Sequence, residues 1–359
     1  MKPSNEKSVG LIFIFLAGLL FQNCKKEQVG PAESTPNSLA TSSVNSLPSV
    51  SSLYEVSTIY KSSVPPDRIC SSSDGTLYFS VPYNNTIYQL TQTGKATLMA
   101  TLPNDGTGTT DVFGIKAGES GTVYAAMINA GKIVKIDAKK HVSYPPVSIG
   151  LNHPYDVAIG PDSTLYIADT ENRRIVKLTS NGTATILAGK TGVGGNADGI
   201  GANARFNKIS SIRYAADGNI WVVDANVTDD FPFVNGSKLR KITPNGTVTT
   251  FFKLSDPNAS IVDFAPAKRD KKFNVTAPEN FFLIKLLRNP DDQFDLQTMI
   301  SHVSNTGVET AIVPYGNGNT DGPAEQASFN YASGITVKPN GIFIADYGNS
   351  AVRVIKPRL

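Results

Sequence analysis

Five charged residues interrupt short apolar segments of this chain at matching positions. They are Arg68 in DRICS, Lys116 in FGIKA, Asp156 in YDVAI, Arg213 in SIRYA and Asp263 in VDFAP. The first, third and fifth precede the central apolar residue of their segment, and the other two follow it. A charge inside an apolar strand is costly unless it is paired or hydrated. We therefore expect either a ring that reads a ligand or mutual salt bridges around trapped water.

Three further residues lie one position earlier in their segments: Asp67, Phe113 and Tyr155. If the strands converge on a channel, these side chains form its rim. A rim of aromatic and carboxylate groups suits recognition of a peptide or a sugar.

The elements that would position these residues recur along the chain. Each copy reads as strand, turn, strand, turn, strand, glycine turn and strand, with Asn-Gly or Asp-Gly between runs rich in Val, Ile, Tyr and Thr, as in antiparallel hairpins. Residues 53–359 hold six copies of about 51 residues each, which suits four-stranded propeller blades. The second strands of the copies are DGTLYFS, SGTVYAA, DSTLYIAD, DGNIWVVD, ENFFLIK and NGIFIAD.

The two ends of this array complement each other. The sixth copy stops after three strands, and a spare strand, LYEVSTIY at 53–60, precedes the first copy. Pairing of this strand into the last blade would close the ring and leave no exposed edge. The sequence thus predicts an all-β fold, a six-bladed β-propeller closed by its N-terminal strand.

The segments HPYDVAIGPDSTLYIADTENRRIVKLTSNGTATILAG and GITVKPNGIFIADYGNSAVRVIKP resemble NHL repeats, whose sheets form six-bladed propellers. The likeness is good in copies 3, 4 and 6, fair in 1 and 2, and poor in 5. Copy 5 lacks the Asp that ends the second strand and has insertions at 266–278 and 288–296. We expect a partner-specific face near these insertions, of which the first carries the basic run AKRDKK.

A metal-dependent enzyme is the second hypothesis, since six-bladed lactonase-like and lyase-like propellers hold a cation with carboxylate, Asn or His ligands at the channel. Here Asp156 and Asp263 could supply two oxygen ligands, but the aligned positions offer no third carboxylate. The three histidines, His141, His153 and His302, form no Ser-His-Asp or Cys-His pattern. We therefore expect no catalytic residues, no metal and no cofactor, and keep a metal-dependent enzyme as the alternative.

Other polar residues favour structural roles. Asp169, Asp224 and Asp346 end the second strands of their copies, where a short carboxylate can accept backbone N–H bonds and fix the following turn. Turn chemistry also explains the Asp-Gly pairs in the loops between copies better than calcium binding does. These pairs begin at Asp105, Asp198 and Asp321. A solvated strand edge explains the basic cluster of Lys238, Arg240 and Lys241.

The N-terminus predicts export. Residues 1–23 have a basic start and an apolar run too short to span a bilayer, as in a signal peptide. The sequence FQNC resembles a relaxed lipoprotein box, which implies a lipid on Cys24; the alternative is ordinary secretion. Residues 24–52, rich in Ser and Pro, predict a flexible tether before the propeller at 53–359. We expect an exported protein anchored to the bacterial cell envelope, on its periplasmic or cell-surface side.

Composition narrows the partners. The formal net charge of +3 lacks the basic footprint of a nucleic-acid-binding protein. The only other cysteine, Cys70, reads as a small buried apolar residue. We expect a monomer that acts as a binding scaffold for a protein or carbohydrate partner, with a metal-dependent lactonase-like or lyase-like enzyme and a surface adhesin as alternatives.

Overall fold

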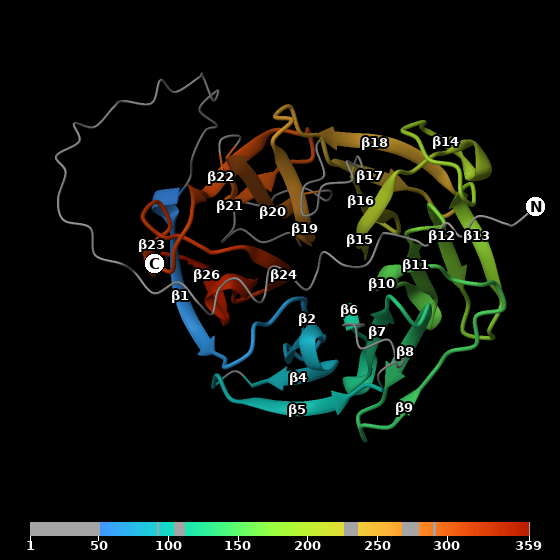
Figure 1. Cartoon of the computed structure of the whole chain (residues 1–359), viewed down its shortest axis with the longest axis horizontal. Coiled ribbons are helices and arrows are strands. Elements are labelled where there is room, and N and C mark those ends of the chain that lie inside the picture. Colours follow the sequence, from blue (N-terminus) through green and yellow to red (C-terminus); the bar gives the residue numbers. More distant parts are fainter. Residues whose placement is uncertain are drawn as a thin grey trace, which may run out of the picture. The chain divides into compact units, whose positions relative to one another are not determined.

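Six antiparallel sheets surround a central axis (Figure 1), so the protein is an all-β, six-bladed β-propeller, as predicted. The computed structural model describes residues 51–91, 93–103, 112–225, 236–267, 280–289 and 292–358. These residues all belong to one compact unit.

In blades 1 to 5 the strands follow chain order from the axis outward, and short 3-10 turns join some of them. Blade 1 holds β2 (Ile69–Ser71), β3 (Leu77–Val81), β4 (Thr86–Leu90) and β5 (Ala96–Thr101); blade 2 holds β6 (Val112–Ala117), β7 (Val123–Met127), β8 (Lys132–Ile136) and β9 (Val142–Ser143); blade 3 holds β10 (Pro154–Ile159), β11 (Leu165–Asp169), β12 (Arg174–Leu178) and β13 (Ala184–Gly189). Blade 4 holds β15 (Lys208–Tyr214), β16 (Ile220–Ala225), β17 (Lys238–Ile242) and β18 (Thr247–Lys253), with β14 (Gly199–Ile200) at its outer edge; blade 5 holds β19 (Ala259–Ala267), β20 (Asn280–Asn289), β21 (Asp292–Val303) and β22 (Glu309–Gly316).

The apolar core lies between the blades. The described residues form six clusters of buried apolar side chains, one for each interface between neighbouring blades. Each blade therefore packs on both faces, and this is why strands β3, β7 and β11 are buried along their whole length instead of alternating. Burial of one large apolar side chain stabilises by roughly 1.5–3 kcal/mol, so these interfaces account for much of the stability of the ring.

The turns from third to fourth strand share one geometry. In blade 3 the N–H of Gly182 donates to Thr179 O at 2.9 Å, and Gly182 has a left-handed φ of +88°. Gly246 repeats this turn in blade 4 with φ +85°. Glycine adopts this conformation without steric cost, so the Asn-Gly pairs produce the predicted hairpins.

Blade 6 is closed by the N-terminal strand, as predicted. It holds β24 (Ala332–Lys338), β25 (Gly341–Asp346) and β26 (Ala351–Pro357), and its outermost main strand is β1 (Tyr54–Lys61). Strand β1 pairs antiparallel with β26, from Tyr54 opposite Pro357 to Lys61 opposite Ala351. The short strand β23 (Gly322–Pro323) pairs with β1 as β14 pairs with β18 in blade 4.

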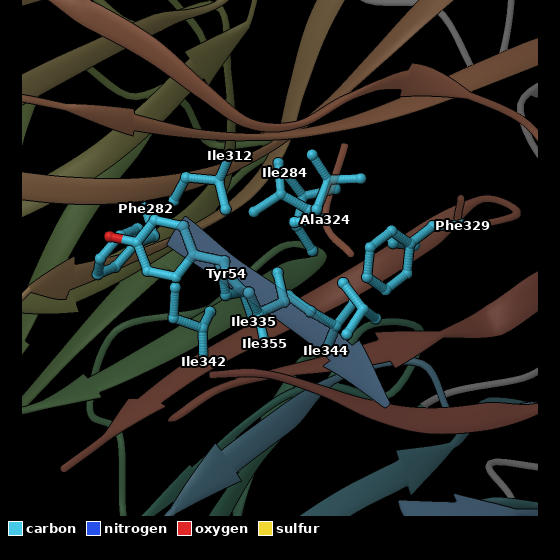
Figure 2. Close-up of a cluster of buried hydrophobic side chains, with 14 of the residues drawn as sticks. Tyr54, Phe282, Ile284, Ile312, Ala324, Phe329, Ile335, Ile342, Ile344 and Ile355 are labelled. Atoms are coloured by element: carbon cyan, nitrogen blue, oxygen red, sulfur yellow. The ribbon is translucent and has the colours of Figure 1, made fainter. Parts of the chain in front are cut away.

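Side chains of β1 enter the core between blades 5 and 6. Tyr54 is 3% exposed and lies among Ile284 of β20, Ile312 of β22 and Ile355 of β26 (Figure 2). The first and last strands thus share one apolar cluster, which hides the edge that an open array would expose.

The N-terminal predictions fall almost entirely outside the described residues. This holds for the signal peptide (1–23), Cys24 and the tether (24–52), except that Ser51 and Ser52 belong to the 3-10 turn η1 (Ser51–Leu53). No helix of the described part of the chain has the length and apolar character needed to cross a membrane.

Candidate functional site

Three of the charged residues predicted at the channel contact one another. Asp156 lies on β10, Arg213 on β15 and Asp263 on β19, which are the inner strands of three consecutive blades. Arg213 donates from Nη1 to Asp156 Oδ2 at 2.5 Å and from Nη2 to Asp263 Oδ1 at 2.5 Å. Burial opposes the charge, but the two carboxylates outweigh it and raise the pKa of the Arg213 guanidinium. One arginine therefore joins three blades.

Backbone N–H groups satisfy the remaining oxygens of these carboxylates. Asp156 accepts from the N–H of Val157 at 2.9 Å and from Ile212 in the next blade at 3.0 Å. Asp263 accepts from Phe264 at 2.9 Å and from Ile335 in the next blade at 3.1 Å. Both carboxylates thus tie neighbouring inner strands together. Such saturated carboxylates are poorly placed to hold a cation, and the described residues contain no cluster of three or more His, Cys, Asp or Glu side chains that could hold a metal.

Arg68 reaches the same network from blade 1. Its Nη1 donates to the carbonyl of Ser333 at 2.6 Å and lies 3.9 Å from Asp263 Oδ2. The guanidinium also stacks on the ring of Phe113, 4.5 Å from the ring centroid. Of the two arrangements open at the sequence level, the structure shows mutual salt bridges for Arg68, Asp156, Arg213 and Asp263.

Large and small residues alternate around this ring. The charged positions Arg68, Asp156 and Asp263 belong to blades 1, 3 and 5, whereas blades 2, 4 and 6 carry Gly114, Ser211 and Gly334. A Cβ on Gly114 would lie 2.6 Å from Asp156 Cα, and one on Gly334 would lie 2.6 Å from the carbonyl oxygen of Asp67. The glycines therefore allow the inner strands to approach each other closely.

Lys116 differs from the other channel charges. It lies on β6 and is half-buried, and no hydrogen bond or ion pair of its ammonium occurs among the described residues. Burial and then the charge of Arg213 lower the pKa of Lys116 to about 8. Cys70 beside it is buried, as predicted, and burial raises the pKa of its thiol to about 12. This cysteine is therefore a neutral wall residue.

The rim positions lie where the inner strands bulge. The β10–β11 register shifts between Pro154 and Asp156, which places Tyr155 at a bulge, and the β6–β7 register shifts across Phe113. A bulge re-aims the side chain of the extra residue. The rings of Phe113 and Tyr155 meet edge to face, with centroids 5.1 Å apart, and the ammonium of Lys208 lies 5.2 Å from the Tyr155 centroid. We call Phe113 and Tyr155 the aromatic collar.

Asp67 departs from the predicted open rim. It is only 6% exposed, its N–H donates to Ser80 O at 2.9 Å, and its own carbonyl accepts from Ser333 Oγ at 2.7 Å. Burial raises the pKa of its carboxyl group. Asp67 therefore belongs to the wall of the ring, and the two aromatic residues carry the rim.

Three tyrosines near Asp67 were not among the predicted site residues. The hydroxyl of Tyr347 donates to that of Tyr83 at 2.5 Å, and the rings of Tyr331 and Tyr347 meet edge to face at 5.7 Å. Burial and then the charge of Asp67 raise the pKa of Tyr331 to about 12. Tyr83 and Tyr347 occupy the same turn, between the second and third strands, in blades 1 and 6. That repeated tyrosine was the signal available in the sequence.

The aspartates that end second strands do fix local structure. Asp169, Asp224 and Asp346 each accept from a backbone N–H just before the inner strand of their own blade, at 2.7, 2.9 and 2.9 Å. Each also pairs with an arginine on the third strand, and these are Arg174, Arg240 and Arg353.

The predicted solvated edge at Lys238, Arg240 and Lys241 is wrong for Lys238 and Arg240, which are both buried. Arg240 is fully buried and Lys238 is 7% exposed. The Arg240 guanidinium lies 4.8 Å from the Phe206 centroid and binds both Asp224 and Asp198 at 2.8 Å. The prediction failed because the local sequence around a buried arginine with two carboxylate partners does not differ from that around an exposed arginine.

The aspartates of two Asp-Gly loops form ion pairs and hydrogen bonds with their blades. Asp198 pairs with Arg240 and accepts from the N–H of Thr250 at 2.9 Å. Asp321 pairs with Arg353 in the same way and accepts from the N–H of Thr58 at 2.9 Å. Buried arginines therefore hold these loops to their blades. In blade 6, Thr58 of β1 makes the contact that Thr250 of β18 makes in blade 4. Asp105 lies outside the described residues.

The two blade-5 insertions leave the blade at opposite ends of its strands. The first follows Ala267 at the end of β19, and residues 268–279 lie outside the described part. The second lengthens the β20–β21 hairpin, beyond the pairing of Leu287 with Ala259. The two insertions therefore lie at opposite ends of the blade, and the partner-specific face stays a prediction.

A separate groove of about 440 Å³ lies away from the channel, between blades 2 and 3. Its lining includes Tyr144, Pro145, Leu165 and Leu178. This groove lies between outer strands, whereas the channel charges lie on inner strands.

Comparison with known proteins supports the fold and leaves the family open. No protein-family model matches the chain, the NHL repeat included, and no curated protein sequence matches it. The chain is similar to the structure of virginiamycin B lyase from Staphylococcus aureus, at 16% identity and a TM-score of 0.56, covering 85% of this chain and 100% of the lyase. Because this identity is low, the likeness establishes the propeller fold alone.

Two other solved structures share this fold. A protein of unknown function from Bacteroides thetaiotaomicron has 14% identity and a TM-score of 0.58, covering 85% of this chain and 76% of that one. An aldose sugar dehydrogenase from Streptomyces coelicolor, solved with bound PQQ, has 13% identity and a TM-score of 0.52, covering 86% and 99%. Neighbours with such different activities leave function to be argued from the site.

Proposed function

We propose that this protein is an NHL-type propeller that acts as a membrane-tethered, extracytoplasmic binding scaffold. Its ligand is a protein or carbohydrate group that enters at the aromatic collar. The observation that supports this proposal is the half-buried pair Phe113 and Tyr155 at bulges of two inner strands, above a ring of paired charges. Ligand sites combine apolar walls with a few placed polar groups, and this mouth has both.

The ring beneath the collar supports a rigid binding surface. Arg213, Asp156 and Asp263 bond one another and the backbone of neighbouring blades. A collar held by such a network loses little freedom when a ligand binds, and this lowers the cost of association. The same pairing occupies the two carboxylates that an enzyme would need as cation ligands, and for this reason we favour binding over a metal-dependent lactonase-like or lyase-like reaction.

The test uses the propeller, residues 53–359, on peptide and glycan arrays. We expect a ligand whose affinity falls at least about tenfold when Phe113 and Tyr155 are both changed to Ala, since burial of each aromatic residue contributes on the order of 1–3 kcal/mol. Tyr144→Ala, an exposed aromatic in the outer groove, is the matched control and should leave binding unchanged. Loss with Tyr144→Ala but not with the collar variant would move the site to the outer groove.

Tethering is tested separately in cells. The proposal predicts that the protein sediments with membranes and that Cys24→Ala releases it into the soluble exported fraction. Protease treatment of intact cells distinguishes the cell surface, the place for an adhesin, from the periplasm. Retention of the Cys24→Ala variant on membranes would contradict the lipid anchor.

A further inference from the structure

Among the described residues, Lys116 is a channel cation whose ammonium forms no hydrogen bond and no ion pair. The other cations here are Arg68 and Arg213, and the carboxylates are Asp67, Asp156 and Asp263. Asp156 and Asp263 are engaged by arginine and backbone N–H groups, and no carboxylate of the described residues forms an ion pair with Lys116. An ammonium in a partly desolvated site is costly without a counterion.

Lys116 lies on β6, the inner strand of blade 2, which packs against the inner strands β2 and β10 of the neighbouring blades. Besides Arg213, the groups that perturb the Lys116 ammonium electrostatically are Asp156, Cys70 and Asp263. These four lie on inner strands β15, β10, β2 and β19, in four blades other than its own. These interactions agree with the place of Lys116 on the inner strand β6. The attraction of the two aspartates is weaker than burial and the repulsion from Arg213, since the pKa of Lys116 is lowered overall.

One residue of the aromatic collar shares a strand with Lys116, and the other lies on the inner strand of the next blade. Phe113 and Lys116 belong to β6, three residues apart, and a strand rises about 3.3 Å per residue. Tyr155 lies on β10, next to Asp156. A ligand in contact with both parts therefore needs an apolar body and an anion that reaches roughly 10 Å or less beyond it.

We propose that the collar receives its ligand end-on, through a carboxylate that pairs with Lys116 and an adjacent apolar or aromatic group that packs on Phe113 and Tyr155. This inference rests on the proposed binding function and names its ligand chemistry. A free peptide C-terminus and a small aryl acid both carry that chemistry. A carboxylate supplies the missing counterion, and Lys116 is mainly protonated at neutral pH because its pKa is about 8.

The experiment compares matched probes by calorimetry on the propeller at low salt. Phenylacetate and a peptide ending in Phe with a free carboxylate are the test probes, and phenylacetamide and the C-terminally amidated peptide are their controls. We expect at least one acid to bind about tenfold or more tightly than its amide. Preference for the peptide or for phenylacetate distinguishes the two sources.

Variants assign the effect to Lys116. Lys116→Met should weaken binding of the acid about tenfold or more, Lys116→Arg should retain part of it, and the exposed Lys139→Met should change nothing. Affinity should also fall as the pH rises through about 8, where Lys116 loses its charge. Equal binding of acids and amides, no loss with Lys116→Met, or no binding of either acid would overturn the inference. The array result with the collar variant is independent of this outcome, so the two proposals can fail separately.

Discussion

At the scale of single residues, Arg213 and Lys116 have similar positions in the sequence but opposite energetic roles. Arg213 contacts two carboxylates directly, whereas Lys116 interacts with them only through longer-range electrostatics. A buried charge stabilises a fold only when its partners make up for lost hydration. The two residues therefore give paired tests.

Arg213→Met should lower the free energy of unfolding by about 3–5 kcal/mol, because it leaves Asp156 and Asp263 buried without their shared cation. Urea unfolding followed by circular dichroism measures this loss. The exposed Lys139→Met serves as control. A loss below about 1 kcal/mol, the range of a surface pair, would show that the clamp is unimportant.

Lys116→Met should instead raise the free energy of unfolding at pH 7, by roughly 1–3 kcal/mol, since a tenfold change in proton affinity corresponds to about 1.4 kcal/mol. The pKa of Lys116 is lowered from 10.5 to about 8, so between these values the unfolded chain binds more protons than the folded one. Stability of the unchanged protein should therefore rise with pH across that window, and the advantage of the variant should shrink. Unfolding curves from pH 7 to 10.5 check the sign, and a constant difference would contradict it.

At the scale of elements, the inner strands depend on two glycines for their spacing. Gly114 faces the backbone of Asp156, and Gly334 faces that of Asp67 and Ile69. At both positions a backbone atom would lie 2.6 Å from the new methyl carbon, so the movement of a side chain alone cannot relieve the overlap. The close approach of blades 2 and 3, and of blades 6 and 1, thus sets the width of the channel.

Gly114→Ala and Gly334→Ala should each destabilise the protein by about 1–3 kcal/mol, the usual cost of overpacking. Gly150→Ala is the matched control, since no heavy atom of another residue lies within 4 Å of the position that its new methyl carbon would occupy, its chain neighbours aside. Thermal unfolding compares the three. If the inner-strand variants unfold at the same temperature as Gly150→Ala, the blades can move apart at little cost.

At the scale of the whole molecule, the N-terminal strand completes a repeated plan. The contact of Thr58 with Asp321 reproduces that of Thr250 with Asp198 in blade 4. Since β1 also supplies Tyr54 and Val56 to the core between blades 5 and 6, both backbone pairing and apolar packing hold the ring closed.

A chain that begins at residue 62 should therefore melt more than about 10 °C below one that begins at residue 53, or fail to fold, because it exposes an edge and loses several buried side chains. The chain from 53 is the control, since it keeps β1 entire. Calorimetry measures the difference, and size-exclusion chromatography detects association through the open edge. Equal melting temperatures would show that closure by β1 is dispensable.

The sequence by itself determined the number of blades, their strand order and the closing strand, because repeated apolar runs and glycine turns are local signals that recur in register. It also placed Arg68, Asp156 and Asp263 at one level of the ring, with Lys116 and Arg213 two residues deeper. Only the tertiary structure decided which of these charges are paired, since that depends on distances between blades. For the same reason the burial of Arg240, the enclosure of Asp67 and the contact of Tyr83 with Tyr347 emerged only when separate blades were brought together.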